Sequence, residues 1–298
     1  MRLPEASELD LITRISRKIK TDSSVVCGIG DDTAVLKYTK NRYLLYTCDM
    51  LIEGVDFTSR ARPEQIGRKA LACSLSDIAA MGGLPRYALV SLGLPKRDAR
   101  SFIDGFYDGL CKLARQFKVN VVGGDLSASQ KIIVDVSVVG QVRKKWLTRR
   151  HGARPGDIIF VSGSLGGSIY GKHLSFIPRI KEANYLVSHY KVNAMMDISD
   201  GLSLDLYRLC QASGVGAVIY EDLVPVAGQA KSFDEALRMG EDFELLFTMP
   251  AAQARRLIKN RGESFKAIGE IRENKFGLKL ITRDYKEKVL ESKGYQHF

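Results

Sequence analysis

The stretch PEQIGRKALACSLSDIAAMGG, residues 63–83, contains a long pattern typical of a single helix. Pro63 stands at its start, where a proline loses no hydrogen bond because the first amide groups of a helix have no partner within it. Gly82 and Gly83 stand at its end, where glycine readily takes the backbone conformation that terminates a helix. The sequence therefore predicts a helix that begins at Pro63 and ends near Met81.

One face of this predicted helix changes in character along its length. Small or apolar residues occupy its first three positions, and a carboxylate occupies the fourth, at the spacing of a single helical stripe. A charged group on a buried stripe costs free energy unless it is paired or bound to a cation. The pattern indicates a cation ligand, and the alternative is a last helical turn that simply reaches solvent. The four residues are Ile66, Ala70, Cys73 and Asp77.

Strands and helices alternate on both sides of this helix. Such alternation favours an α/β (α+β) protein. The polar, basic connector RKKWLTRRHGARPGD at 143–157 gives the best boundary, and it predicts an N-terminal domain at 1–142 and a C-terminal domain at 143–298. The other expected strands are 42–49, 87–94, 119–122, 132–142, 158–162 and 243–248, and the other expected helices are 8–20, 98–117, 201–213 and 251–259.

Composition narrows the class of protein. The chain has 298 residues, of which 45% are hydrophobic and 27% charged, as is ordinary for a globular protein. No apolar stretch approaches the ~18 residues that span a bilayer, and acidic residues interrupt the N-terminus, unlike in a signal peptide. Five scattered cysteines predict reduced thiols, and four scattered histidines exclude an HExxH metal helix. We therefore expect a cytoplasmic protein without a membrane partner.

The formal net charge is +11, because 45 Lys and Arg residues outnumber 34 Asp and Glu residues. Such a surplus raises the question of nucleic-acid binding. The basic connector 143–157 contains a single aromatic residue, Trp146, and no pattern of a known nucleic-acid-binding module accompanies it. We expect a solvated connector, one of whose arginines could hold a nucleotide phosphate, and no nucleic-acid partner.

The acidic residues carry a clearer pattern than the basic ones. Carboxylates recur beside glycines, at strand ends and helix termini, although each motif alone is compatible with an ordinary turn. Together they indicate a shared site for Mg²⁺, which is usually held by a few carboxylates plus water and substrate phosphate. The motifs are GIGDDTAVL at 28–36, Asp49, Asp77, GGD at 123–125, DISDG at 197–201 and GED at 240–242.

A glycine-rich stretch, GGSIYGKH at 166–173, is one residue short of a Walker A phosphate loop. His173 stands where the Ser or Thr that contacts Mg²⁺ would be required. No later hydrophobic strand ends in a convincing Walker B acid. We therefore expect a glycine-rich turn that opens a helix, and not a P-loop ATPase.

The order of the motifs resembles that of the thiamine-monophosphate kinase family. This family is an ATP-dependent branch of the superfamily that includes aminoimidazole ribonucleotide synthetase and selenophosphate synthetase. The resemblance spans nearly the whole chain and implies a two-domain aminoimidazole ribonucleotide synthetase-like fold, an N-terminal sheet that forms a homodimer interface, and ATP between the domains. It rests on GIGDDTAVL, TCDMLIEGVDF, GRKALACSLSDIAAMGG, GGD, LTRRHGARPGD, DISDGLSLDL, GEDFELLFT and KGYQHF.

The resemblance also implies a reaction and its residues. ATP would phosphorylate thiamine monophosphate directly to thiamine diphosphate, the last step of its biosynthesis, with the help of several Mg²⁺ ions. No general base is expected, because the acceptor phosphate is already anionic near neutral pH. The implied metal ligands are Asp32, Thr47, Cys48, Asp49, Asp77, Asp125, Asp197 and Asp200; the implied ATP contacts are Gly124, Asp125, Arg149 and Ser199; the implied substrate contacts are Asp56, Glu241 and Phe298.

Several positions depart from the family pattern. Cys48 stands where a hydroxyl residue is usual, and a thiol is a poor ligand for Mg²⁺. Asp56 replaces the usual His, Arg68 replaces a common Trp, and the segment between Gly171 and Pro178 is short. These departures affect the pocket for thiamine more than the phosphate chemistry.

Two other interpretations stay open from the sequence. The chain could be a selenophosphate or aminoimidazole ribonucleotide synthetase, although it lacks the reactive Cys in a glycine-rich N-terminal segment that is typical of the former. It could also be a non-catalytic nucleic-acid-binding or assembly factor that retains the fold. Formation of thiamine diphosphate from ATP and thiamine monophosphate would distinguish them.

Overall fold

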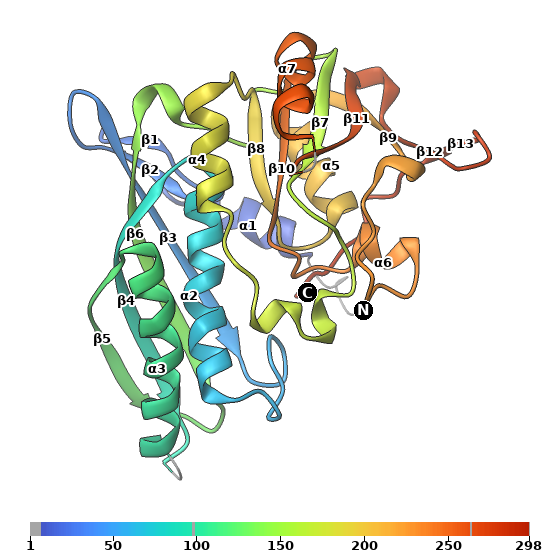
Figure 1. The fold of residues 1–298 in the computed structure, drawn as a ribbon. Helices are drawn as coiled ribbons and strands as arrows, with labels where there is room; N and C mark the ends of the chain where they lie inside the picture. Colours follow the sequence, from blue (N-terminus) through green and yellow to red (C-terminus); the bar gives the residue numbers. More distant parts are fainter. Residues whose placement is uncertain (1–6, 97–98, 263, 298) are drawn as a thin grey trace, which may run out of the picture.

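The computed structural model describes residues 7–96, 99–262 and 264–297. Its strands form two sheets, one from each half of the chain (Figure 1). No helix in these ranges is both long enough and apolar enough to cross a membrane.

The N-terminal sheet has six strands in the order β1-β2-β3-β6-β4-β5. β4 and β5 run parallel, and the other neighbours in the sheet run antiparallel. The strands are β1 (Val25–Cys27), β2 (Ala34–Lys37), β3 (Arg42–Ile52), β4 (Leu84–Leu94), β5 (Asn120–Ala128) and β6 (Ile133–Arg143).

The two faces of this sheet differ. Helices α2 (Pro63–Ala80) and α3 (Ala99–Phe117) cover the inner face, where alternate residues of β6 are buried (Figure 1). Because side chains alternate between the two faces of a strand, the residues between the buried ones lie on the outer face, which is open in the single chain. Several of its apolar side chains are at least 44% exposed and lie around a cavity of about 220 Å³; they include Tyr46, Tyr87, Leu89 and Val122.

The C-terminal sheet has seven strands in the order β13-β12-β9-β11-β7-β10-β8. Its strands are β7 (Asp157–Val161), β8 (Ala194–Ile198), β9 (Val215–Tyr220), β10 (Glu244–Pro250), β11 (Lys266–Glu273), β12 (Leu278–Ile281) and β13 (Glu287–Val289). The helices of this half are α4 (Ile180–His189), α5 (Leu202–Ser213), α6 (Phe233–Arg238) and α7 (Ala251–Arg261).

Helix α2 lies between the two halves of the molecule. It packs against α3 and β3 on the N-terminal side, and against α4 and β8 on the C-terminal side. One continuous apolar cluster contains buried residues of both halves, such as Leu75 and Phe247. Any polar residue on the side of α2 that faces the C-terminal half is therefore held at the junction of the halves.

Three expectations about local structure need correction. The helix expected over 8–20 ends earlier, as α1 (Glu8–Ser16); Ser7 caps it, but none of its residues is buried. The strand expected over 119–122 continues through the GGD motif to Ala128. The stretch 166–173 forms two short 3-10 turns instead of opening an α-helix, because positive φ angles at Gly166 and Gly167 turn the chain sharply.

Candidate functional site

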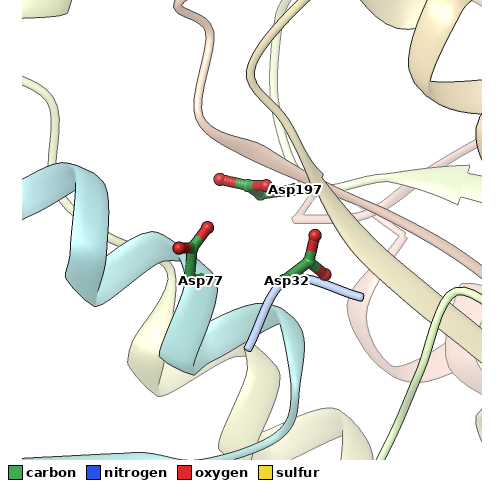
Figure 2. A group of neighbouring side chains, drawn as sticks. All are labelled: Asp32, Asp77 and Asp197. Atoms are coloured by element: carbon green, nitrogen blue, oxygen red, sulfur yellow. The ribbon is translucent and has the colours of Figure 1, made fainter. Parts of the chain in front are cut away.

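Three aspartates from distant parts of the chain point toward one another (Figure 2). Asp77 lies on α2, Asp32 in the loop between β1 and β2, and Asp197 on β8. One carboxylate oxygen of each lies within 4.8 Å of the others. Asp32 and Asp197 are buried, and Asp77 is half-buried. We call these residues the three-aspartate cluster.

Hydroxyl groups hold two of the three carboxylates in place. The Ser76 Oγ donates a hydrogen bond of 2.5 Å to Asp197 Oδ2, across the junction between α2 and β8. The Thr47 Oγ1 donates to Asp77 Oδ2 from β3. The stripe of small residues that precedes Asp77 on α2 is buried, as expected from the sequence: Ile66, Ala70 and Cys73.

Arg150 holds the third carboxylate. Its Nε and Nη2 atoms lie 2.9 and 2.6 Å from Asp32 Oδ1. The other oxygen, Oδ2, is buried and has no hydrogen-bond partner among the described residues. Because buried polar atoms in folded proteins are nearly always paired, this oxygen is free to bind a ligand that the chain itself does not supply.

The electrostatics of the cluster favour a bound cation. Burial raises the pKa of Asp77 and of Asp197 well above the ordinary value, and the charges of neighbouring aspartates raise both further. Burial also raises the pKa of Asp32, although Arg150 opposes this effect. Three crowded carboxylates with one unpaired buried oxygen form an all-oxygen donor set, which fits a hard cation such as Mg²⁺.

Asp49 lies beside this cluster on the inner face of β3. It accepts a hydrogen bond of 2.8 Å from the Ser74 Oγ on α2. Burial raises its pKa to about 6, and Asp135, Glu241 and Asp56 add to this effect. The structure thus brings Thr47 and Asp49 to the three-aspartate cluster, as the sequence led us to expect.

Cys48 does not join this group. It lies between Thr47 and Asp49 on β3, and its thiol therefore points to the opposite face of the sheet, where the residue is exposed. The sequence led us to expect the Cys48 thiol at the cluster, but the single chain does not bring it there, because adjacent strand residues cannot share a face.

Gly124 and Asp125 also lie away from the three-aspartate cluster. Asp125 is exposed and pairs in register with Ser91 on β4, next to the outward-facing residues of that strand. Gly124 has a packing role, because a Cβ atom there would lie 1.8 Å from the carbonyl oxygen of Val90. In the single chain, the structure does not bring these two residues to the cluster.

The segment after β8 holds two further expected residues. Asp200 forms an ion pair with Arg208 on α5, and its backbone amide donates to the buried Asp205 at 3.0 Å. The Ser199 carbonyl oxygen accepts a 2.6 Å hydrogen bond from the Glu241 amide. Both residues therefore border the cluster through Asp197 and its loop, but they are not part of it.

Arg149, an expected ATP contact, is half-buried, and its carbonyl oxygen accepts a hydrogen bond of 2.9 Å from the Met195 amide. The contact of Arg149 with ATP stays a prediction, and its neighbour Arg150 is the arginine that contacts Asp32. The sequence offered no means to choose between the two, since both are arginines in one basic run.

A second polar cluster surrounds Lys69 on α2, and the sequence analysis missed it. The Lys69 side chain is fully buried, and its Nζ lies 2.6 Å from Glu241 Oε2 and 2.7 Å from the Asp56 carbonyl oxygen. His173 Nδ1 lies 3.2 Å from the same Nζ. A lysine next to the apolar run ALAC of this helix was the available signal. Asp56 and Glu241 thus lie together as expected, whereas Phe298 falls outside the described residues.

Comparison with known proteins identifies the family. Residues 30–142 match the family described as AIR synthase related protein, N-terminal domain, and residues 154–280 match its C-terminal domain. The chain is 36% identical to the thiamine-monophosphate kinase of Aquifex aeolicus, over 100% of both chains, and 34% identical to that of Bacillus subtilis, over 98% and 99%. The chain belongs to the thiamine-monophosphate kinase family. It is therefore an enzyme of the kinase class.

A solved structure of this family has the same architecture. The AaThiL structure complexed with AMPPCP and TMP matches with a TM-score of 0.87 and 35% identity, over 100% of this chain and 99% of that one. This match confirms the two-domain aminoimidazole ribonucleotide synthetase-like fold that the motifs of the thiamine-monophosphate kinase family implied.

Proposed function

We propose that this kinase transfers the γ-phosphoryl group of ATP to the phosphate of thiamine monophosphate, which gives thiamine diphosphate. The observation that carries the proposal is the meeting of Asp32, Asp77 and Asp197 at one point. Its support is the family itself, together with a relative that was solved with AMPPCP and TMP. The rival synthetases share the fold, but the curated relatives at 34–36% identity are thiamine-monophosphate kinases.

The physical difficulty of this reaction is the approach of two polyanions. At ~4 Å, two unit charges repel by roughly 4 kcal/mol at an effective dielectric constant of 20. Bound Mg²⁺ supplies the charge that neutralises this repulsion and aligns the phosphates for in-line transfer. Asp32, Asp77 and Asp197 are the residues that would hold it. The acceptor oxygen is anionic at neutral pH, so the chain needs no general base.

The neighbouring residues fix where those carboxylates point. Thr47 and Ser76 orient Asp77 and Asp197, and Arg150 fixes the Asp32 carboxylate through Oδ1 and leaves Oδ2 unpaired. Asp49 adds a further carboxylate on the side of the cluster that faces Glu241 and Asp56.

Helix α2 separates the phosphate end of the site from the acceptor end. Lys69 and Asp77 are eight residues apart on it, which corresponds to about 12 Å along a helix axis. This separation suits a substrate whose phosphate reaches the three-aspartate cluster while its ring system lies near Lys69, Asp56 and Glu241.

The open outer face of the N-terminal sheet supports a homodimer. Basic residues lie at one end of this face, at the paired positions Arg42 and Arg143, and Asp125 and Asp135 lie near the other. A two-fold pairing of two such faces, with strand directions opposed, brings the basic end of each against the acidic end of the other. The exposed apolar side chains between them are then buried.

The direct test is a product assay. Purified protein is incubated with ATP, Mg²⁺ and thiamine monophosphate, and thiamine diphosphate is quantified by chromatography. Parallel reactions contain the substrates of aminoimidazole ribonucleotide synthetase or of selenophosphate synthetase instead. We expect product only in the reaction that contains thiamine monophosphate together with ATP and Mg²⁺. No thiamine diphosphate, or turnover of a rival substrate, would reject the proposal.

A further inference from the structure

We infer that His173 is a substrate-specificity residue, whose Nε2–H donates a hydrogen bond to a ring nitrogen of the acceptor's aminopyrimidine, and that Lys69 positions it. This inference deepens the proposed function and rests on it. It starts from the fully buried ammonium group of Lys69, which has no place in the phosphate chemistry.

The ammonium group of Lys69 lies close to three polar atoms. They are the Asp56 carbonyl oxygen at 2.7 Å, Glu241 Oε2 at 2.6 Å and His173 Nδ1 at 3.2 Å. An ammonium group has no lone pair, so it donates in its hydrogen bond with His173 and Nδ1 accepts. His173 Nδ1 therefore carries no proton in this arrangement, and the ring proton lies on Nε2.

This tautomer leaves His173 with one unused donor. No described residue accepts a hydrogen bond from its Nε2. The His173 side chain is 14% exposed and the Glu241 side chain is 24% exposed, so both are partly accessible from outside the cluster. The imidazole ring of His173 thus lies beside the carboxylate of Glu241, with His173 Nδ1 and Glu241 Oε2 3.6 Å apart.

The short segment that carries His173 is firmly fixed. Arg68, adjacent to Lys69 on α2, donates to the carbonyl oxygens of Ser175 at 3.1 Å and Phe176 at 2.8 Å. The Phe176 ring stacks on Phe243, with ring centroids 4.2 Å apart. A donor on so constrained a loop is preorganised for a ligand, because little conformational entropy is lost when it binds.

The opposite wall is equally constrained. Glu241 has a positive φ of 69°, and its amide donates to the Ser199 carbonyl oxygen. The neighbouring Gly240 allows this close approach, because a Cβ there would lie 2.4 Å from the same oxygen. A backbone in the left-handed region costs a non-glycine residue free energy, so the surrounding contacts hold Glu241 in place.

Local charge decides which part of the acceptor lies here. Among the described residues, Lys69 is the cation that contacts Glu241 directly, whereas Glu241, Asp56 and Asp49 are close enough to act on one another. The balance is negative, which disfavours a phosphate and favours the ring system of thiamine, whose thiazolium ring carries a positive charge. An aminopyrimidine offers an amino donor next to a ring-nitrogen acceptor, which complements a carboxylate beside an imidazole N–H.

The test compares His173→Ala and His173→Gln in steady-state kinetics. Glutamine keeps an amide N–H near the position of Nε2, whereas alanine removes the donor. We expect His173→Ala to raise the KM for thiamine monophosphate by roughly 3- to 10-fold, the usual effect of one lost hydrogen bond, with little change in kcat or in the KM for ATP. His173→Gln should recover part of this loss. His189→Ala, at an exposed histidine of α4, is the matched control.

Pyridine analogues of thiamine monophosphate, in which one ring nitrogen is replaced by CH, provide a second measurement. Wild-type enzyme should discriminate against one of these analogues, and His173→Ala should not. Three results would overturn the inference. They are an unchanged KM for thiamine monophosphate in His173→Ala, equal increases in the KM values for ATP and for thiamine monophosphate in both His173→Ala and His173→Gln, and equal use of all analogues by the wild type. The proposed function itself fails if wild-type enzyme forms no thiamine diphosphate or turns over a rival substrate, so the two failures are distinguishable.

Discussion

Arg150 donates two hydrogen bonds to Oδ1 of Asp32 and leaves Oδ2 of the same buried carboxylate without a hydrogen-bond partner among the described residues. The arginine therefore performs two tasks. It offsets part of the cost of burying a negative charge, and it leaves the other oxygen unpaired on a carboxylate that meets Asp77 and Asp197. Neither task could be assigned from the sequence, where Arg150 is one of several arginines in a basic connector.

Replacement of Arg150 by Met tests whether this arginine offsets the cost of burying the Asp32 charge. The Asp32 side chain is fully buried, and removal of one partner of a buried ion pair costs about 3 kcal/mol, because the remaining charge is left uncompensated. We expect a lower midpoint of urea unfolding at pH 7.5, and a partial recovery in millimolar Mg²⁺. Arg154→Met, at an exposed position of the same connector, serves as control. Equal stability of the two variants would contradict the assigned role.

Substitution of Asp77 or Asp49 by Asn tests the positioning role of the carboxylates. Each change removes a charge but keeps the shape and most hydrogen bonds of the side chain. We expect turnover to fall by at least ~100-fold, which corresponds to about 2.7 kcal/mol of transition-state stabilisation. The fold should survive, because burial already disfavours the ionised form of both groups. Circular dichroism checks the fold, and retained turnover in both variants would rule out this site.

The sequence predicted the three-aspartate cluster better than the polar cluster around Lys69, for a physical reason. A carboxylate on the buried stripe of α2 or at the end of β8 is anomalous in itself, so Asp77 and Asp197 could be recognised without knowledge of their neighbours. Contacts such as Lys69 with His173 join segments 104 residues apart, and no local pattern encodes them. Strand alternation alone, however, would have separated Cys48 from Thr47 and Asp49.

The secondary structure, too, was predicted well only where the local sequence pattern is strong. Elements with strong local patterns, such as α2 and β3, were predicted within a few residues, whereas the extension of β5 through GGD was not. Glycines lower strand propensity, yet pairing with β4 at close range requires Gly124. The division of the chain at 142 and 143 stays a prediction, as does a cytoplasmic location.

Magnesium should stabilise the protein more at pH 7.5 than at pH 5. The pKa of Asp49 is raised to about 6 from an ordinary value of 3.8. Such a group contributes stability in its protonated form, and this contribution is lost as the pH rises from about 4 through 6. The metal-free enzyme therefore carries an electrostatic penalty at pH 7.5 that Mg²⁺ relieves, while protons compete with Mg²⁺ at pH 5.

Thermal unfolding with and without 5 to 10 mM Mg²⁺, a range of roughly 100 times a sub-millimolar Kd, provides the measurement for this prediction. The increase in Tm should be several degrees at pH 7.5 and should shrink at pH 5. Asp77→Asn should lose most of the increase at both values. A shift that is independent of pH, or unaffected by this substitution, would argue that Mg²⁺ binds elsewhere.

Charge introduced on the outer face of the N-terminal sheet should separate the proposed dimer. Leu89 is 44% exposed in the single chain and lines the outer-face cavity. Leu89→Glu places a carboxylate where two apolar faces would meet, and burial of an unpaired charge there costs several kcal/mol. We expect a dimer mass for the wild type in light scattering and a monomer mass for the variant. Ile258→Glu, at an exposed apolar position of α7 in the other half, should remain dimeric. A monomeric wild type would show that the chain does not form the proposed dimer. Two variants that behave alike would show that the interface does not lie on this face.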